Sequence, residues 1–213
     1  IYPDRMVANA RALAPYLDEI ELVLFESAET GNLPSEDEID DLVRIRKRHE
    51  LGYNVHLPLD IFIGDEDRGV RDRGVATIRR VLELTEPLRP STYTLHLNPD
   101  NRNGTKTTDL KRWKRSVHRC LEEVLASGVS PEEISVETLN YPFELVEDII
   151  ESLGLSICLD VGHLVLYGYP VWDYIERYGP KTSIVHLHGI ENGRDHLSLA
   201  RTERSTLEEL LRV

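Results

Sequence analysis

The segment SICLDVGHL, residues 156–164, ends a run of strand-forming residues with two ionisable side chains. Asp160 closes the apolar run, and His163 follows three residues later. A buried strand gains nothing from a carboxylate at its end, because removing a charge from water is costly unless a partner compensates it. The pair therefore indicates that a pocket begins where this strand ends.

Histidines recur at similar places along the chain. Six of the 8 histidines lie near the ends of predicted strands or in the loop that follows: His56, His96, His163, His186, His188 and His196. One histidine in a strand is most often an ordinary core or surface residue, but six of them together with Glu137 and Asp160 are hard to explain in that way. A divalent ion would compensate the buried carboxylates. Imidazole and carboxylate ligands suit zinc, manganese, iron or cobalt, and a site without thiolates normally keeps a position open for water or substrate.

Six strand patterns and the helical segments between them must position these residues. Short runs rich in Val, Ile, Leu, Tyr and Thr occur at 19–27, 53–60, 92–99, 133–140, 156–163 and 182–190. Strands that alternate with helices predict a parallel sheet, either an open doubly wound sheet or a closed (β/α)8 barrel. In both folds the carboxyl ends of the strands meet at one rim, so residues far apart in sequence can surround one pocket.

The helical segments have their own boundary signals. Ser35 and Glu38 have the spacing of a capping box, and Gly128 is placed to end a helix. The helical pattern at 5–17 has no strand pattern before it, and the one at 201–213 has none after it. We therefore expect one domain over residues 1–213, an α/β fold of the (β/α)8 TIM barrel type from which the first and last strands are missing.

Charge and composition narrow the possible partners. The net charge of −13 and the pI of about 5.1 oppose binding to nucleic acid, which depends on clustered Lys and Arg. No apolar stretch approaches the roughly 20 residues of a membrane span, and the first ten residues lack the features of a secretion signal. We expect no membrane partner and a cytoplasmic location. The two cysteines, Cys120 and Cys158, are expected to be core thiols.

The order of these residues resembles that of the xylose isomerase-like barrel superfamily. The likeness rests on VHLPLD, TLHLNP, SVETLN, LDVGH, VHLHG and GRDHLSL, and it spans almost the whole chain. That superfamily includes endonuclease IV-type phosphodiesterases and sugar isomerases or epimerases. Within it, YLDEIELVLFES and VHLPLD are most similar to the cobamide-remodelling phosphodiesterases, which hydrolyse the phosphodiester of the corrinoid nucleotide loop.

The two branches of the superfamily imply different ligand sets. The isomerase branch implies one divalent ion held by a Glu, an Asp, a His and a last-strand Glu; Glu137, Asp160 and His186 match the first three, and the fourth is expected beyond Val213. The phosphodiesterase branch adds further ligands, matched here by His56, His96, His163, Asp195 and His196. This fuller set implies two or three ions. Endonuclease IV-type enzymes separate the late Asp and His by one residue, whereas Asp195 and His196 are adjacent, which puts the third ion in doubt.

The fuller set favours metal-dependent hydrolysis of a small-molecule phosphodiester, with the cobamide nucleotide loop as the expected substrate. The catalytic set would be Glu137, Asp160 and His186, with Glu137 as the bridging ligand. Candidate substrate-binding residues are Glu26, Asn98, Asn140 and His188, although turn chemistry at a strand end explains such residues at least as well. Two alternatives stay open: a metal-dependent isomerase or epimerase acting on a sugar or sugar phosphate, and a non-catalytic barrel that binds a corrinoid or a sugar phosphate.

Overall fold

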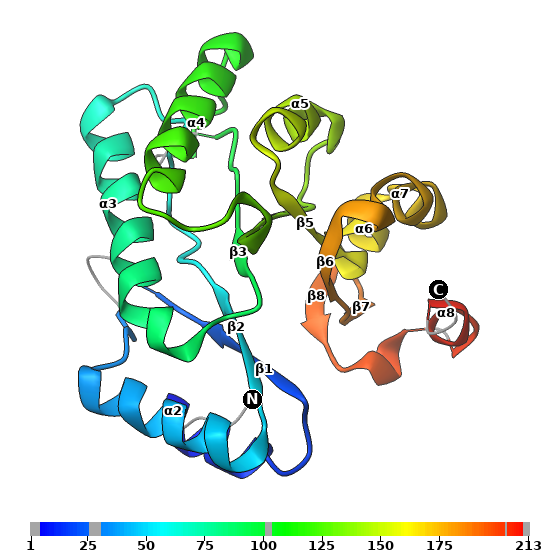
Figure 1. Ribbon diagram of the computed structural model, residues 1–213. Coiled ribbons are helices and arrows are strands. Elements are labelled where there is room, and N and C mark those ends of the chain that lie inside the picture. The colour runs from blue at the N-terminus through cyan, green and yellow to red at the C-terminus, as the bar shows by residue number, and fades with distance from the viewer. Residues whose placement is uncertain (1–4, 26–30, 101–103, 203, 211–213) are drawn as a thin grey trace.

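Six parallel strands form one sheet in which each strand lies beside the next one in the sequence (Figure 1). The computed structural model describes residues 5–25, 31–100, 104–202 and 204–210. The strands are β1 (Glu19–Val23), β2 (Gly52–His56), β3 (Tyr93–Leu95), β4 (Ile134–Glu137), β5 (Ser156–Asp160) and β6 (Thr182–His186). The predicted α/β fold is confirmed, because this strand order is that of a barrel wall and lacks the reversal of a doubly wound sheet.

The helices between the strands lie outside the curved sheet, and one further helix comes before β1 and one near the C-terminus after β6 (Figure 1). They are α1 (Met6–Leu13), α2 (Glu36–His49), α3 (Arg68–Thr85), α4 (Leu110–Leu125), α5 (Glu144–Leu153), α6 (Val161–Tyr167), α7 (Val171–Tyr178) and α8 (Arg204–Leu210). Short 3-10 turns cover Glu86–Leu88, Pro131–Glu133, Gly179–Lys181 and Leu199–Arg201. Within the described ranges, no helix has the length and apolar character needed to cross a membrane.

The capping box predicted for α2 is present, whereas Gly128 lies two residues beyond the C-cap of α4, which is Ala126. Ser35 and Glu38 form the predicted capping box at the start of α2, each side chain bonding to the backbone of the other residue. Gly128 has φ +104° and follows the end of α4 by three residues, in the turn toward β4. The capping box thus marks the start of α2, and Gly128 lies in the turn that leads from α4 to β4.

The two faces of the sheet have different chemistry because side chains alternate along each strand. The outer face packs apolar side chains against the helices, and the buried Tyr53 hydroxyl donates to the Leu42 carbonyl of α2 at 3.2 Å. The inner face carries hydroxyl groups near the amino ends of the strands. Thr92 contacts Ser135, whose Oγ lies 2.5 Å from the Ser183 Oγ. The ionisable side chains lie above this row of hydroxyls, toward the carboxyl ends.

The chain after β5 differs from the prediction in two places. The loop expected at His163 is the first turn of α6, which follows β5 without a break. The single strand expected over 182–190 ends at His186, and a separate antiparallel hairpin follows, formed by β7 (Gly189–Glu191) and β8 (Arg194–Leu197). Asn192 and Gly193 form its two-residue turn with φ +54° and +71°, the conformation that Asn-Gly favours in tight hairpins. His188 therefore lies between β6 and the hairpin, outside both strands.

Candidate metal centre

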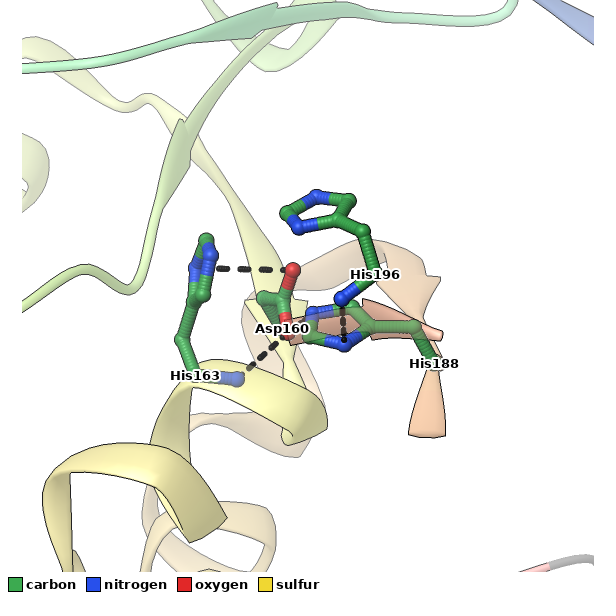
Figure 2. Close-up of side chains that lie close together, drawn as sticks. All are labelled: Asp160, His163, His188 and His196. Carbon is green, nitrogen blue, oxygen red and sulfur yellow. Dashed lines mark hydrogen bonds and ion pairs between the residues drawn. The ribbon is translucent and has the colours of Figure 1, made fainter. Parts of the chain in front are cut away.

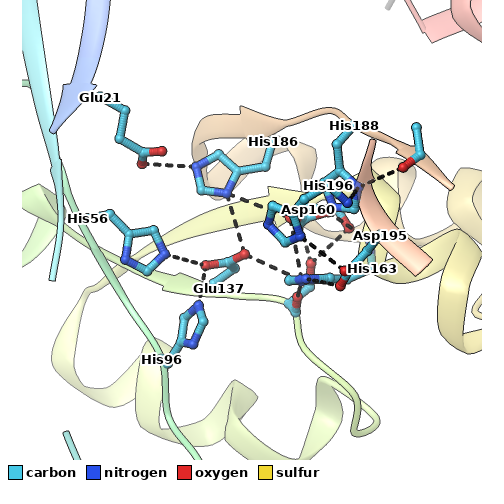
Figure 3. Close-up of polar contacts among 12 residues, drawn as sticks. Glu21, His56, His96, Glu137, Asp160, His163, His186, His188, Asp195 and His196 are labelled. Carbon is cyan, nitrogen blue, oxygen red and sulfur yellow. Dashed lines mark hydrogen bonds and ion pairs between the residues drawn. The ribbon is translucent and has the colours of Figure 1, made fainter. Parts of the chain in front are cut away.

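Ionisable side chains from all six parallel strands converge at the carboxyl end of the sheet (Figure 3). Glu21 comes from β1, and His56, Glu137, Asp160 and His186 end their own strands. The other members are His96, His163 and His188, which follow β3, β5 and β6 closely, and Asp195 and His196, which lie in β8. The structure thus brings together all the residues predicted to bind metal, although their roles as ligands stay a prediction.

Glu137 lies at the centre of this group, and its two carboxylate oxygens face different imidazoles. Oε2 lies 3.1 Å from Nε2 of His56 and 2.7 Å from Nε2 of His96. Oε1 lies 3.4 Å from Nδ1 of both His163 and His186. The residue is only 2% exposed, and although burial opposes ionisation, His186, His56 and His96 hold the pKa of the Glu137 carboxyl well below its usual range. The carboxylate is therefore an anion shared by two sets of nitrogen atoms.

The ring of His56 shows why a cation fits between these groups. Its Nδ1 lies 2.8 Å from the Leu57 carbonyl, which can only accept, so Nδ1 carries a proton and donates it. A neutral ring then directs a bare Nε2 at the Glu137 carboxylate, and two acceptors cannot bond to each other. Burial lowers the pKa of His56, but Glu137 outweighs it and raises the pKa above its ordinary value. Either a proton or a divalent ion must lie between the two groups.

Asp160 combines a structural contact with a free oxygen. Its Oδ1 accepts the backbone N–H of His163 at 2.7 Å, so Asp160 is the N-cap of α6. Its Oδ2 is fully buried, has no hydrogen-bond partner in the described part of the chain, and lies 3.4 Å from Nδ1 of His163 and 3.7 Å from Nδ1 of His186. A buried carboxylate oxygen without a donor is costly, and a cation would remove that cost.

His163 has the orientation that a metal-binding histidine normally has. Its Nδ1 donates to the Thr138 carbonyl at 3.0 Å, which leaves Nε2 without a proton in the neutral ring. Nε2 lies 3.9 Å from Oδ2 of Asp195, and the His196 ring centroid is 5.7 Å from that of His163. Asp195 and His196 are more exposed than the other members, with His196 67% exposed. The hairpin thus carries its two residues to the open side of the site.

Two residues near His186 are absent from the predicted set. Glu21 Oε1 lies 3.1 Å from Nε2 of His186, and Cys158 lies close enough to Glu137 and His186 to share an ion with them. The alternation in EIELV places Glu21 on the face opposite to Leu22, which was a usable signal. Cys158 is fully buried, as expected for a core thiol, and burial raises its pKa to about 12.

The donor atoms form three groups, and within each group the potential ligand atoms lie within 4.8 Å of one another. One group is His56, His96 and Glu137, a second is Glu137, Cys158 and His186, and the third is Asp160, His163, His188 and His196 (Figure 2). Imidazole and carboxylate groups at these separations fit divalent ions of the zinc, manganese, iron and cobalt class. Two observations support that fit: Oδ2 of Asp160 is buried without a donor, and the two oxygens of Glu137 face different imidazoles.

The predicted substrate-binding residues lie in different surroundings. Asn98 is half-buried, and its side-chain amide donates to the Leu59 carbonyl at 3.4 Å. Asn140 is exposed, three residues after the end of β4. His188 lies within the third group, 3.1 Å from Asp160. Glu26 lies outside the described residues. All four assignments to substrate binding stay predictions.

Known structures share this fold at low sequence identity. A D-tagatose 3-epimerase-like protein has a TM-score of 0.75 at 21% identity, covering 98% of this chain and 83% of that one. Endonuclease IV from Thermus thermophilus has a TM-score of 0.62 at 20% identity, covering 90% and 75%. An IOLI protein with a bound zinc atom has a TM-score of 0.68 at 15% identity, covering 89% and 69%. At these identities the likeness shows the fold alone.

A comparison with curated proteins gave no match. Residues 8–204, nearly the whole chain, match the family described as the xylose isomerase-like TIM barrel. The match agrees with the parallel strand order and with the ionisable residues at the strand ends. The chain therefore belongs to the xylose isomerase-like TIM barrel family.

Proposed function

We propose that the protein is a metal-dependent phosphodiesterase that acts on a small molecule, with the nucleotide-loop phosphodiester of a cobamide as the favoured substrate. The observation that carries this proposal is the position of Glu137, whose Oε2 faces Nε2 of His56 and His96 while Oε1 faces Nδ1 of His186. A carboxylate whose two oxygens face different imidazoles is arranged to bridge two cations. One divalent ion would not need both oxygens.

In hydrolysis of a phosphodiester, the oxygen of a water bonds to phosphorus, one P–O ester bond breaks, and the departing oxygen takes up a proton. Divalent ions, when bound, supply a more acidic water and neutralise charge on the phosphoryl oxygens. The chain's own part is to hold and orient them. His56 and His163 are fixed through Nδ1 by the Leu57 and Thr138 carbonyls, so their Nε2 atoms point into the site.

The choice of substrate rests on charge and on resemblance. A net charge of −13 disfavours a polyanionic duplex, because binding to DNA draws on clustered basic side chains. A small phosphodiester that enters the rim among the histidines avoids most of that repulsion. The likeness of YLDEIELVLFES and VHLPLD to cobamide-remodelling phosphodiesterases directs the proposal to the corrinoid nucleotide loop.

A second candidate function is that of a sugar or sugar-phosphate epimerase or isomerase. The observation in its favour is the set Glu137, Asp160 and His186, which suffices for a single ion, together with the fold shared with epimerase structures such as D-psicose 3-epimerase. A further carboxylate, that of Glu21, contacts Nε2 of His186, the ring nitrogen that does not face Glu137. Under this function His56 and His96 would have no required role.

The test is a side-by-side assay of the metal-loaded full chain. Cobamides, a chromogenic bis-aryl phosphodiester, abasic DNA, and ketoses with their phosphates are each incubated with Zn, Mn or Co, and products are identified by mass spectrometry and NMR. We expect phosphodiester cleavage that Glu137→Gln abolishes. Epimerisation without any phosphodiester cleavage would replace the proposal by the second function. No turnover with any metal would favour a non-catalytic binding barrel.

A further inference from the structure

The ring of His188 is in close contact with two neighbours. The ring of His196 is stacked on it, with centroids 4.3 Å apart and planes inclined by 13° (Figure 2). Gly162 in the first turn of α6 also lies against the ring, so close that a Cβ there would overlap Cε1, Nε2 and Nδ1 of His188. The His188 side chain is only 10% exposed. Its ring is therefore fixed in both position and plane.

The hydrogen bond at Nδ1 sets the tautomer of this ring. The backbone N–H of His196 donates to Nδ1 of His188 at 3.0 Å. An atom that accepts a hydrogen bond carries no proton, so the proton of a neutral ring is on Nε2. The competing contact, from Nδ1 to the Gly189 carbonyl, is longer at 3.5 Å. The hairpin thus holds His188 in the form whose Nε2 is a donor.

That donor faces Asp160. Nε2 of His188 lies 3.1 Å from Oδ1 of Asp160, the oxygen that also caps α6. The contact is electrostatic and imperfectly aligned, since Nε2 has no in-line hydrogen bond among the described residues. Oδ1 therefore faces two N–H groups, while Oδ2 has none and points toward His163 and His186.

We infer that His188 is a positioning residue for Asp160 and not a metal ligand, in place of the substrate-binding role that the sequence predicts. Its Nε2 proton holds Oδ1 in place so that Oδ2 is directed at the cation. The third group then has three ligands, Asp160, His163 and His196, and His188 supports one of them. The inference rests on the proposed function, because it requires that a cation binds at Oδ2.

The conformation of His196 fits this arrangement. Its φ of +53° lies in the left-handed region, which is unfavourable for a residue with a Cβ. In this conformation, the backbone N–H of His196 donates to Nδ1 of His188. Replacement of His196 by glycine would keep that N–H and suit the backbone, while removing the imidazole.

The first experiment measures zinc affinity and stoichiometry by calorimetry and metal analysis for wild type, His188→Ala, His188→Gln and His196→Gly. The inference predicts that His188→Ala keeps the zinc stoichiometry and loses about 10–100-fold in affinity, as removal of an outer partner of a ligand does. His188→Gln should recover most of the affinity, because its carboxamide offers both a donor and an acceptor. His196→Gly should lower the stoichiometry, because it removes a ligand while keeping the backbone N–H.

The second experiment observes the His188 ring directly in the unaltered chain, so it does not depend on the folding of any variant. In the native chain loaded with NMR-active cadmium, long-range proton–nitrogen spectra should show a protonated Nε2 on His188 and no coupling from cadmium to that atom. Cadmium coupling at His188 Nε2, loss of one equivalent of zinc in His188→Gln, or unchanged affinity in His188→Ala would each overturn the inference. Failure of the unaltered chain to bind any zinc would instead overturn the proposed function.

Discussion

Glu21 and His186 are 165 positions apart in sequence and belong to the two edge strands of the six-stranded sheet, yet Oε1 of Glu21 lies 3.1 Å from Nε2 of His186. The contact joins β1 to β6 across the mouth of the curved sheet. It also occupies Nε2 of His186, so Nδ1 is the atom turned toward Glu137 and Asp160, at 3.4 and 3.7 Å.

We expect Glu21→Gln to weaken zinc binding by about 10-fold, because loss of the carboxylate releases the preferred tautomer and orientation of His186. Isothermal calorimetry with zinc measures the effect. Glu19→Gln is the matched control: Glu19 lies two residues earlier on the same strand, and its carboxylate bonds to Ser91 at 2.5 Å instead. Equal effects of the two substitutions would contradict a specific role for Glu21.

Glu137→Gln should be more harmful than His196→Ala. The first substitution removes the anion faced by His56, His96, His163 and His186, whereas the second removes a side chain that is 67% exposed. We expect phosphodiester turnover to fall by more than about 100-fold in Glu137→Gln and by less than about 10-fold in His196→Ala. Initial rates at saturating metal, with zinc content measured in parallel, check this order. A larger loss in His196→Ala would place the reaction at the third group of ligands.

The Asn-Gly turn of the β7–β8 hairpin offers a test that leaves every ionisable side chain in place. Gly193 has φ +71°, so Gly193→Ala should strain the turn by about 1–2 kcal/mol and loosen the hairpin that carries Asp195 and His196. Hydrogen exchange in residues 189–197 should accelerate, and the affinity of the most weakly bound ion should fall.

Gly128→Ala is the control for Gly193→Ala. Gly128 has φ +104°, lies in the turn before β4, and is open to a Cβ, with no atom within 4 Å. It should lose a similar amount of stability without altering metal binding. If both variants weakened metal binding equally, the effect would come from general loss of stability and not from the hairpin.

Cys158 should be unreactive in the folded protein even though it lies beside the metal centre. Burial raises the pKa of its thiol to about 12, so in mildly alkaline buffer the group stays protonated and lacks nucleophilicity. Iodoacetamide followed by peptide mass spectrometry should find Cys158 unmodified in the native chain and modified in urea. Rapid alkylation of the native, metal-free protein would show that the strand ends open readily.

Some of this site could be read from the sequence because parallel strands bring their carboxyl ends to one rim. That rule alone placed Glu137, Asp160 and His186 together, since each one ends a strand. It could not find Glu21, which lies within a strand and meets His186 only because the sheet curves until its two edges approach. Curvature depends on the packing of all the helices against the outer face.

The hairpin after β6 was missed for a different reason. The run TSIVHLHGI reads as one strand, and the Asn-Gly pair that marks the turn comes only after it. His186 and His188 both fall within that run, but they contact different carboxylates: Glu21 and Glu137 for His186, and Asp160 for His188. Likewise, Asp160 and His163 have the spacing of a helix N-cap and the residue that it bonds, but a loop was predicted there and the start of α6 was missed.

The close approach of Gly162 to the His188 ring has an evolutionary consequence. Any side chain at position 162 would occupy the space of the imidazole, so a methyl group there is compatible only with a smaller or displaced residue at position 188. The two positions, 26 residues apart, should therefore vary together among related chains. Where a residue with a Cβ replaces the glycine, the histidine should be absent, and Asp160 should be held by some other donor.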